Sequence, residues 1–488
     1  MENLPILTLL VAVPAVTALA IAFADPERRG TLRALAMGGA LLTLVAAVVL
    51  LVRFQAGEAG FQLEESAAWV PQWGITYRLG VDGISLLLVV LTALMQPLVL
   101  LASWNQEHRA KGFYASLMIL QAALMGVFLA LDLVLFYVMF EVMLVPMYAL
   151  IGIYGSGNRH SAALKFFLYT LVGGLLMLVG VLYLYFAAGA TSFDYDVIRQ
   201  VELSAREQFW LFWLFFAAFA IKVPMWPLHT WLPDAHTEAP TAGSVVLAAV
   251  MLKIGGYGFL RFSLPLFPAA VQRLAPAMMA LAVIGVLYGA LVSIVQRDIK
   301  RLVAYSSVSH LGFVVLGVFA LQSTAAAGSV VQMVNHGLST GALFLLIGFL
   351  YERAHTREIA AFSGLLKAAP IFGGLFLVTA MSSIALPGLN GFVGEFPILI
   401  GTFQTSRWAA SLAAFGVILA ALYLLWAYQR MFHGSVEGEA VGFVDLDRRE
   451  IAVLVPLVVL MLAIGLYPKP LYDRVNPSVE RVLAEVSQ

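Results

Sequence analysis

Apolar residues divide the chain into long runs that are separated by short polar segments. A helix that crosses a bilayer needs about 20 mainly apolar residues, and only helices or closed barrels satisfy their backbone groups in lipid. Barrel strands would alternate apolar and polar positions, which these runs do not. The pattern predicts about fourteen membrane spans, at residues 4–24, 31–53, 80–103, 112–130, 133–153, 161–188, 208–231, 242–263, 274–296, 301–320, 328–351, 369–405, 408–432 and 450–467.

The first run, residues 4–24, is expected to remain in the protein as a transmembrane helix. It is longer than the apolar core of an ordinary signal peptide. Its nearest positive charges, Arg28, Arg29 and Arg33, follow the run, whereas a signal peptide carries such charges before its apolar core.

Composition excludes several classes of function. The chain is 61% hydrophobic and 11% charged, against roughly 25% charged residues in a soluble domain. It has no cysteine, so it carries neither a disulfide nor an iron–sulfur cluster. Its 28 basic and 28 acidic residues cancel and leave no basic field for nucleic acid. We therefore predict an all-α polytopic membrane protein without a redox centre of its own.

The sequence offers one candidate for a metal-binding motif, a pair of histidines on either side of Trp231. His229 and His236 are seven residues apart across a proline, so they lack the i, i+4 spacing of a helical zinc pair. We expect no metal site in the chain.

The distribution of lysine and arginine predicts the orientation of the chain. Alternate loops carry sixteen and ten basic residues, and Arg261 is counted among the ten. Because basic residues are retained on the cytoplasmic side, both termini are expected on the outer side. The two remaining basic residues, Lys222 and Lys253, fall inside apolar spans.

Four ionisable residues lie deep within predicted spans: Glu141, Lys222, Lys253 and Glu395. Glu141 is nine residues beyond Asp132, which is about 13 Å along a helix. A charge near the bilayer centre costs about 2.5–3.5 kcal/mol on insertion scales, so such residues are usually functional and paired. Proton transfer is one role for them, and a structural ion pair is the alternative. Asp132 itself lies near a loop and is expected to cap a helix or to reach the interface.

Two spans are interrupted beside these residues. Pro224 and Pro227 follow Lys222, and the segment 387–391 precedes Glu395. Proline removes helix hydrogen bonds, and paired discontinuous helices indicate the ion site of inverted-repeat transporters. The spans predict four regions: N-terminal helices at 1–111, a five-helix repeat at 112–263 broken near 222–229, a second five-helix repeat at 274–432 broken near 387–391, and a C-terminal helix and tail at 450–488.

Two histidines on apolar helices supply candidate links between these sites. His310 follows a serine-rich turn, and His336 follows an asparagine. A neutral imidazole accepts and donates a hydrogen bond at once, which suits proton transfer. A packed, hydrogen-bonded histidine without a transport role is the alternative for each.

Four segments resemble one known family, the antiporter-like membrane subunits of NADH-quinone oxidoreductase, respiratory complex I. They are KVPMWPLHTWLPDAHTEAPTAGSVVLAAVMLK at 222–253, RDIKRLVAYSSVSH at 297–310, LGVDGISL at 79–86 and LPGLNGFVGEF at 386–396. The similarity spans nearly the whole chain. Within the family, the glutamate at 395 and an end after about fourteen helices resemble the M-type subunit, chain M.

The resemblance implies a role for each buried ionisable residue. By this resemblance, Glu141 and Lys222 would form the glutamate–lysine pair of the inlet half. Lys253 would form the central relay with His310 and His336, and Glu395 would be the outlet site.

The resemblance also implies the setting of this relay. The chain would translocate protons across a bacterial inner membrane, driven by redox chemistry in other subunits. FMN, iron–sulfur clusters and quinone are expected in those partners, which include sister antiporter-like chains of the membrane arm. The alternatives are a subunit of a multisubunit cation/proton antiporter or of a membrane-bound hydrogenase, and a structural membrane spacer.

Overall fold

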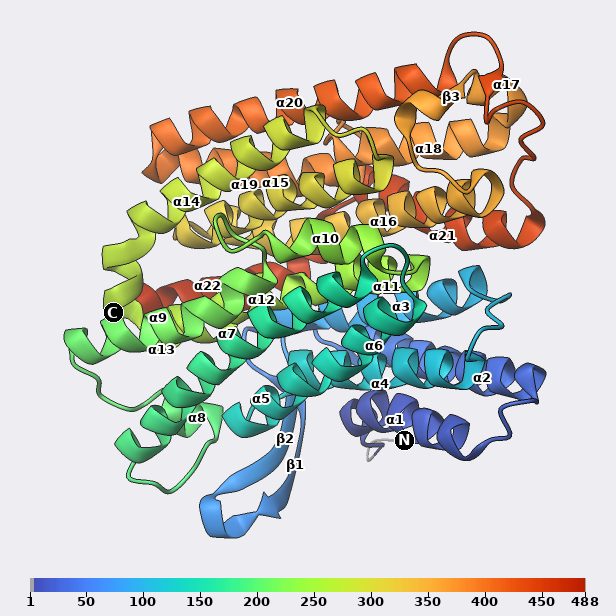
Figure 1. Ribbon diagram of the computed structural model, residues 1–488. Coiled ribbons are helices and arrows are strands. Elements are labelled where there is room, and N and C mark those ends of the chain that lie inside the picture. Colours follow the sequence, from blue (N-terminus) through green and yellow to red (C-terminus); the bar gives the residue numbers. More distant parts are fainter. Residues whose placement is uncertain (1–3, 488) are drawn as a thin grey trace. The chain divides into compact units, whose positions relative to one another are not determined.

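A computed structural model describes residues 4–487, and twelve helical spans within them are long and apolar enough to cross a membrane (Figure 1). They coincide with twelve of the fourteen expected spans. They are α1 (Ile6–Phe23), α2 (Arg29–Arg53), α3 (Gly83–Ala102), α4 (Ala110–Leu129), α5 with α6 (Leu133–Val142 and Leu144–Tyr154), α7 (Arg159–Ala187), the span Thr241–Leu266, α14 (Pro268–Ile294), α15 (Ile299–Phe319), α16 (Ser323–Ala354), α20 (Arg407–Phe432) and α21 (Arg448–Leu466).

The other two expected spans are the two that were predicted to be broken. The first consists of α9 (Ala205–Lys222) and α10 (Trp231–Glu238), and the second of α18 (Pro370–Ser383) and α19 (Asn390–Thr405). Proline has no N–H group to continue a helix, and Pro224, Pro227 and Pro387 all fall in the two gaps. Each of these two helix pairs is therefore separated by a gap that contains proline.

The span Thr241–Leu266 is irregular in a way that the sequence did not reveal. It consists of α11 (Thr241–Val246), a π-helical turn, α12 (Lys253–Gly258), a second π-helical turn and α13 (Leu264–Leu266); the two π-helical turns are Leu247–Met251 and Phe259–Ser263. Such turns are rare in proteins, and those that occur are often found at functional sites. Arg261 lies within the second turn and is only 2% exposed, so its placement in an outer loop is wrong.

The described residues form two compact units. The first contains the chain up to Lys222, residues 250–275 and the residues from Asp473 onward; the second contains residues 223–249 and 276–472. Each unit is considered by itself below.

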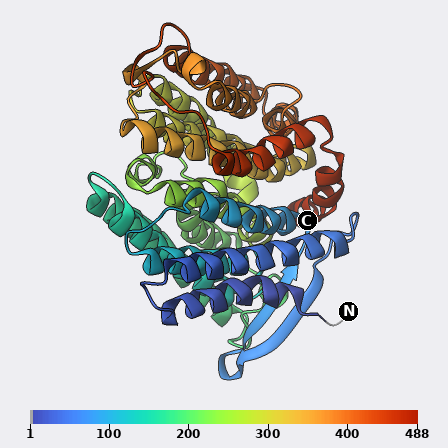
Figure 2. The ribbon, with the colours of Figure 1, turned by 90° about the vertical axis from the view of Figure 1, so that its right-hand side faces the viewer.

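In the first unit, buried and surface helices differ sharply. Helices α1 and α2 lie side by side (Figure 2). In the most apolar 18-residue stretch of α2, only 33% of the residues are buried, whereas 83% are buried in the corresponding stretches of α3 and α4. The large apolar side chains that α1 and α2 leave exposed are those expected of helices that face lipid.

A β-hairpin between α2 and α3 corrects the prediction of an all-α chain. Strands β1 (Gln62–Val70) and β2 (Ile75–Val81) pair antiparallel around a 3₁₀ turn, Pro71–Trp73. Thr76 of β2 donates from its backbone N–H to Asp132 Oδ2 at 2.9 Å. Asp132 Oδ1 accepts from the N–H groups of Val134 and Leu135, so its predicted capping role is confirmed.

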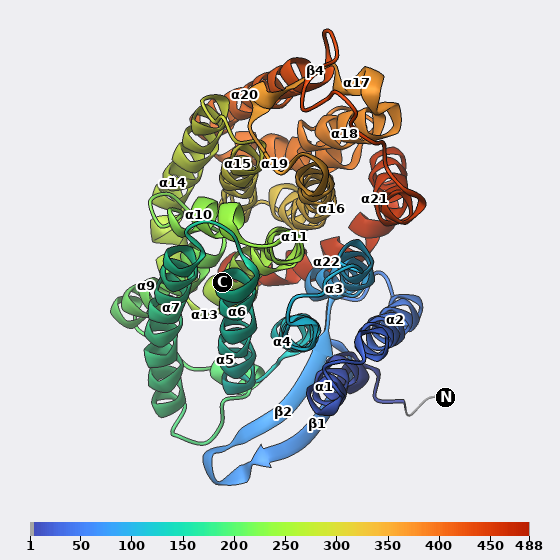
Figure 3. The ribbon, with the colours of Figure 1, turned by 45° about the vertical axis from the view of Figure 1, so that its right-hand side comes forward.

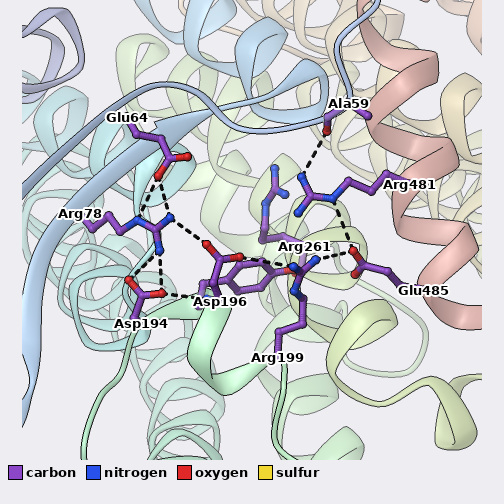
Figure 4. A network of polar contacts seen from close by, with 10 residues as sticks. Ala59, Glu64, Arg78, Asp194, Asp196, Arg199, Arg261, Arg481 and Glu485 are labelled. Carbon is purple, nitrogen blue, oxygen red and sulfur yellow. Dashed lines mark hydrogen bonds and ion pairs between the residues drawn. The ribbon is translucent and has the colours of Figure 1, made fainter.

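The hairpin is tied to the rest of the first unit by a cluster of ion pairs (Figure 4). Arg78 of β2 contacts Asp194, Glu64 and Asp196 at 2.6–2.8 Å. Asp196 lies in the short helix α8 (Tyr195–Ile198). Burial disfavours the charged guanidinium, but the hydrogen bonds of the three carboxylates outweigh it and raise the pKa of Arg78 above its ordinary value. Arg78 therefore stays charged at any physiological pH.

The expected C-terminal tail is in fact the amphipathic helix α22 (Lys469–Ser487). Its residue Ser478 is buried and accepts from the backbone N–H of Gly83 at 2.9 Å. A Cβ atom at Gly83 would come 1.8 Å from the carbonyl oxygen of Arg474. Glycine is therefore required where α22 meets the beginning of α3.

The second unit is centred on α15, α16 and α19, which pack together (Figure 3). Glycines allow the close approach of α16 and α19: a Cβ at Gly394 would come 2.3 Å from Gln332 Oε1, and one at Gly328 would come 3.1 Å from the carbonyl oxygen of Gly394. The unit's remaining short elements are α17 (Leu365–Ala368), a 3₁₀ turn (Ile359–Ala361) and the paired strands β3 (Phe362–Ser363) and β4 (Glu437–Gly438).

One buried ion pair fastens α21 to α16 within the second unit. Arg353 donates from Nη1 and Nη2 to the two carboxylate oxygens of Glu450, at 2.8 and 2.6 Å. The side chain of Glu450 is 2% exposed, and Glu450 also completes a capping box with Asp447 at the start of α21.

Replacing Arg353 with glutamine should lower the free energy of unfolding by about 3 kcal/mol, because Glu450 would remain as a buried charge without its partner. The measurement is the denaturation midpoint of the detergent-solubilised protein. Arg449→Gln is the matched control, since Arg449 lies 3.9 Å from Asp447, too far for a hydrogen bond, and should cost less than about 1 kcal/mol. Equal effects of the two substitutions would contradict this account of α21.

Candidate functional site

Glu141 lies at the end of α5, where that helix gives way to α6 at Met143. Gly174 of α7 faces it, because a Cβ atom at position 174 would come 1.7 Å from Glu141 Oε1. That oxygen has no hydrogen-bond partner within residues 4–487. The absence of a side chain at Gly174 therefore creates the space in which the carboxyl group sits.

Lys222 is the last residue of α9 and is 1% exposed. Its Nζ atom lies 4.8 Å from the centre of the Phe140 ring and 5.7 Å from that of Phe166. The faces of aromatic rings attract a cation, and more strongly where water is absent. The amine also has no hydrogen-bond partner in the described part of the chain.

Glu141 and Lys222 are brought together in the first unit. Phe140, over which the amine lies, is the neighbour of Glu141 on α5, and the charges of Glu141 and Lys222 interact electrostatically. Neither Glu141 Oε1 nor Lys222 Nζ is held by a hydrogen bond within residues 4–487. The two groups thus influence each other through space and without a direct contact that would fix them.

Lys253 belongs to the same unit and is fully buried at the start of α12, directly after the first π-helical turn. Two turns further along, Arg261 Nη2 contacts Asp82 Oδ1 at 2.5 Å, and both side chains are 3% exposed. Neither residue of this buried pair carries a role that the sequence predicts.

In the second unit, Glu395 and His310 are directly joined. His310 Nδ1 and Glu395 Oε1 are 2.6 Å apart, and the same oxygen accepts from Gln332 Nε2 at 2.8 Å. On the other side of the imidazole, Nε2 lies 3.2 Å from the hydroxyl of Tyr423. The ring of His336 is centred 6.0 Å from that of His310. Glu395, His310 and His336 therefore form one buried cluster.

The helix break next to Glu395 is held by polar side chains. Asn335 of α16 donates to the carbonyl oxygen of Asn390 at 2.6 Å, and Ser382 donates to the Asn390 side chain at 2.5 Å. Backbone groups that a broken helix leaves free need such partners at membrane depth. Glu395 Oε2 itself has no hydrogen-bond partner within residues 4–487.

Several polar residues of the buried regions were not predicted. Gln332 and Tyr423 carry no motif that would single them out. Lys300 was counted as a loop residue, yet it is buried and donates to the carbonyl oxygen of Ala239 at 2.6 Å. Asp82 could have been noticed as an acidic residue at the edge of an apolar run.

The two histidines near the first helix break, His229 and His236, contact aromatic rings. His236 stacks on Phe344 with the ring centres 4.5 Å apart, and His229 lies edge-on to Tyr288 at 5.0 Å. Within residues 4–487, no group of three or more His, Asp or Glu side chains is arranged to hold a metal ion.

The chain is similar to membrane subunits of respiratory enzymes over its whole length. Residues 130–422 match the family described as "NADH:quinone oxidoreductase/Mrp antiporter, TM", and residues 59–131 match "NADH-ubiquinone oxidoreductase chain 4, amino terminus". NADH-quinone oxidoreductase subunit M of Rhodobacter capsulatus is 44% identical over 497 aligned positions, which cover 99% of this chain and 97% of that protein. The chain belongs to the NADH:quinone oxidoreductase/Mrp antiporter family.

Two solved structures have the same fold as this chain. A chain of respiratory complex I from Thermus thermophilus with bound NADH is 34% identical, with a TM-score of 0.90 and 98% and 99% of the two chains covered. A chain of the Mrp complex from Dietzia sp. is 22% identical, covers 100% of both chains and gives a TM-score of 0.87. At that identity, the second match shows a common fold alone.

Gly174→Ala should lower the stability by less than about 1 kcal/mol, because the new methyl group meets the end of the Glu141 side chain, which no hydrogen bond at Oε1 holds and which can move aside. Gly374→Ala on α18 is the control, since a Cβ there meets nothing within 4 Å. It should be neutral or stabilising by about 0.4–1 kcal/mol. The thermal unfolding midpoints of the two variants and the wild type measure both effects. A loss of about 1–3 kcal/mol in Gly174→Ala would show that the Glu141 carboxyl group is held in place and cannot move aside.

Proposed function

We propose that the chain is the proton-translocating, antiporter-like M subunit of NADH:quinone oxidoreductase and that its buried Glu, Lys and His residues carry the protons. The observation that supports this most strongly is the pairing of each broken helix with an ionisable group. Lys222 ends α9, and Glu395 lies one turn into α19. Redox chemistry would take place in other subunits, which would hold the FMN, the iron–sulfur clusters and the quinone.

In the first unit, the Glu141–Lys222 pair would control the entry of protons. Moving the carboxylate toward or away from the amine changes the proton affinity of both groups, because opposite charges favour each other's ionised form. The absence of a direct contact leaves both groups free to make such a movement. A proton released from Lys222 would pass to Lys253, the next buried amine along the relay.

In the second unit, the Glu395–His310 contact would carry the exit step. A hydrogen bond of 2.6 Å between an imidazole and a carboxyl group allows a proton to shift from one to the other. Tyr423 orients the far side of the imidazole, and His336 lies beside it as the neighbouring relay group. Glu395 would release its proton into a hydrated cavity beyond the break in the helix.

The wider arrangement is part of the same proposal. Residues 112–263 and 274–432 would form two inverted five-helix repeats that follow the first helices at 1–111 and precede the C-terminal helices at 450–488. The uneven distribution of lysine and arginine supports an orientation with both termini on the outer side of a bacterial inner membrane. Sister antiporter-like chains of the membrane arm would be the neighbouring subunits.

Two other functions make different predictions. A subunit of a cation/proton antiporter would operate without NADH oxidation, and co-purification with NADH dehydrogenase activity distinguishes it. A structural spacer would not need its buried charges, and Lys222→Met tests this because methionine keeps the bulk of lysine and removes its charge. Normal pumping by the assembled Lys222→Met complex would establish the spacer.

Glu141→Gln should reduce proton pumping by on the order of tenfold or more, since a positioned acid or base contributes typically about 100-fold or more to proton transfer. Assembly should remain close to normal, because glutamine keeps the shape of the side chain. The measurement is the NADH-driven proton flux of the purified complex in vesicles, with Glu58→Gln in an exposed loop as the matched control. Full pumping by an assembled Glu141→Gln complex would exclude a relay role.

Glu395→Gln distinguishes an exit site from a helix cap. Glutamine still forms hydrogen bonds with Gln332 and His310 but has no dissociable proton, so the variant should assemble and pump on the order of tenfold more slowly. Glu439→Gln, a change at an exposed position, should pump normally in the same assay. If Glu395→Gln pumps at the wild-type rate, the residue serves only to hold the broken helix.

A further inference from the structure

Three polar residues follow one another along the span that carries Lys253. Lys253, Tyr257 and Arg261 are spaced by four residues, which places them on one side of a helix. Arg261 Nε donates to the Tyr257 hydroxyl at 3.2 Å, and that hydroxyl donates to the carbonyl oxygen of Phe128 at 3.3 Å. Lys253, Tyr257 and Arg261 therefore form a row of polar groups. The row leads from Lys253 toward the part of the first unit that contains the β-hairpin.

The row ends at the buried ion pair of Arg261 and Asp82. Asp82 Oδ1 accepts from Arg261 Nη2 at 2.5 Å and also from the backbone N–H groups of Ile84 and Ser85 at 3.1 and 3.0 Å. The carboxylate thus caps α3 and holds the guanidinium at the same time. Arginine does not lose its proton in proteins, so its positive charge is fixed at this point.

On the far side of the pair lies a small cavity close to solvent. Its volume is about 10 Å³, enough for about one water molecule, and its wall includes Asp82, Arg261, Tyr195 and Glu485. The ring of Phe61 covers Arg261 at 4.8 Å, and the Tyr195 hydroxyl donates to the Arg261 carbonyl oxygen at 3.0 Å.

Charged side chains of α22 and of the residue after α8 lie next to the cavity, and Figure 4 shows the contacts between them. Arg199, Glu485 and Arg481 are joined by ion pairs, and their side chains are 26%, 23% and 29% exposed. The Arg261–Asp82 pair, with both side chains 3% exposed, therefore separates buried Lys253 from a hydrated charged surface.

We propose that the Asp82–Arg261 pair is an electrostatic seal that prevents protons from passing between Lys253 and the hairpin side of the membrane. This inference rests on the proposed function, because it assumes that Lys253 carries protons. A fixed positive charge in a narrow polar passage repels protons and other cations, as arginines do in water-conducting pores. Asp82 holds that charge across the passage and lowers the cost of burying it. Protons that reach Lys253 do not leave on the hairpin side of the first unit.

The test is the passive proton leak of the complex without NADH, in phosphatidylethanolamine–phosphatidylglycerol vesicles with a valinomycin potassium potential and an internal pH dye. The double variant Asp82→Asn/Arg261→Gln removes both charges and leaves neither ion buried alone. Its leak should exceed that of the wild type by on the order of tenfold. The N–H groups of Ile84 and Ser85 at the start of α3 already offset part of the negative charge of Asp82, so the variant removes a net positive field from the proton path. Adding Lys253→Met should restore the wild-type leak.

Further variants separate the charge from the packing. Arg407→Gln, a change at an exposed arginine outside this row, should leak no more than the wild type. Phe61→Ala removes the ring that covers Arg261 but retains the charge, so it should also remain tight; a leak there would mean that the ring is the barrier. A tight double variant, or a leak that persists with Lys253→Met, would overturn the proposal.

The readout also separates this proposal from the proposed function. The leak is measured without turnover, whereas the relay is tested by NADH-driven pumping in Glu141→Gln. A complex that pumps through Glu141 and yet shows no leak in the double variant would refute the seal alone. A double variant that leaks through Lys253, together with normal pumping by Glu141→Gln, would refute the role of Glu141 and leave the seal intact.

Discussion

The cost of burying a charge away from water governs the interior of this protein. Each buried ionisable side chain must find an opposite charge, a hydrogen bond or an aromatic ring, because the bilayer supplies none of them. The chain meets this requirement in different ways. Arg261 and Asp82 are in direct contact, Glu395 shares a hydrogen bond with His310, and Lys222 lies over the Phe140 ring. These arrangements suit different roles. A pair in direct contact keeps its charges in place, whereas a pair without direct contact allows its groups to move and to change their protonation.

Irregular backbone accompanies nearly all of these residues. Lys222 and Glu395 adjoin broken helices, Lys253 and Arg261 lie beside or within π-helical turns, and Glu141 lies where α5 and α6 meet. Regular helices satisfy every backbone group internally and leave no polar atom to share. An interruption releases backbone groups and side chains that can hold water or take part in proton transfer, at the expense of hydrogen bonds that Asn335, Asn390 and Ser382 partly replace.

Hydropathy alone locates the spans because each must bury its backbone within one continuous apolar run. Prolines and deep charges then locate the breaks and most of the candidate site. The sequence could not reveal the partners that lie far apart along the chain: Glu395 is 85 residues from His310, and Arg261 is 179 residues from Asp82. Arg261 was misplaced because it lies near the end of its apolar run, where a loop residue and a buried one look alike. The hairpin was missed because its strands lie almost wholly outside the apolar spans and because β1, QLEESAAWV, does not alternate apolar and polar residues.

The beginning of α3 has a consequence for how the protein is made. The carboxylate of Asp82 finds its guanidinium 179 residues later in the chain, and the N–H of Gly83 finds the Ser478 hydroxyl 395 residues later. A ribosome synthesises the chain from its N-terminus, so α3 enters the membrane long before either partner exists. The first unit is therefore completed only after α22 has been translated. Until then the hairpin end of the nascent protein contains an acidic residue and a backbone donor without these two partners.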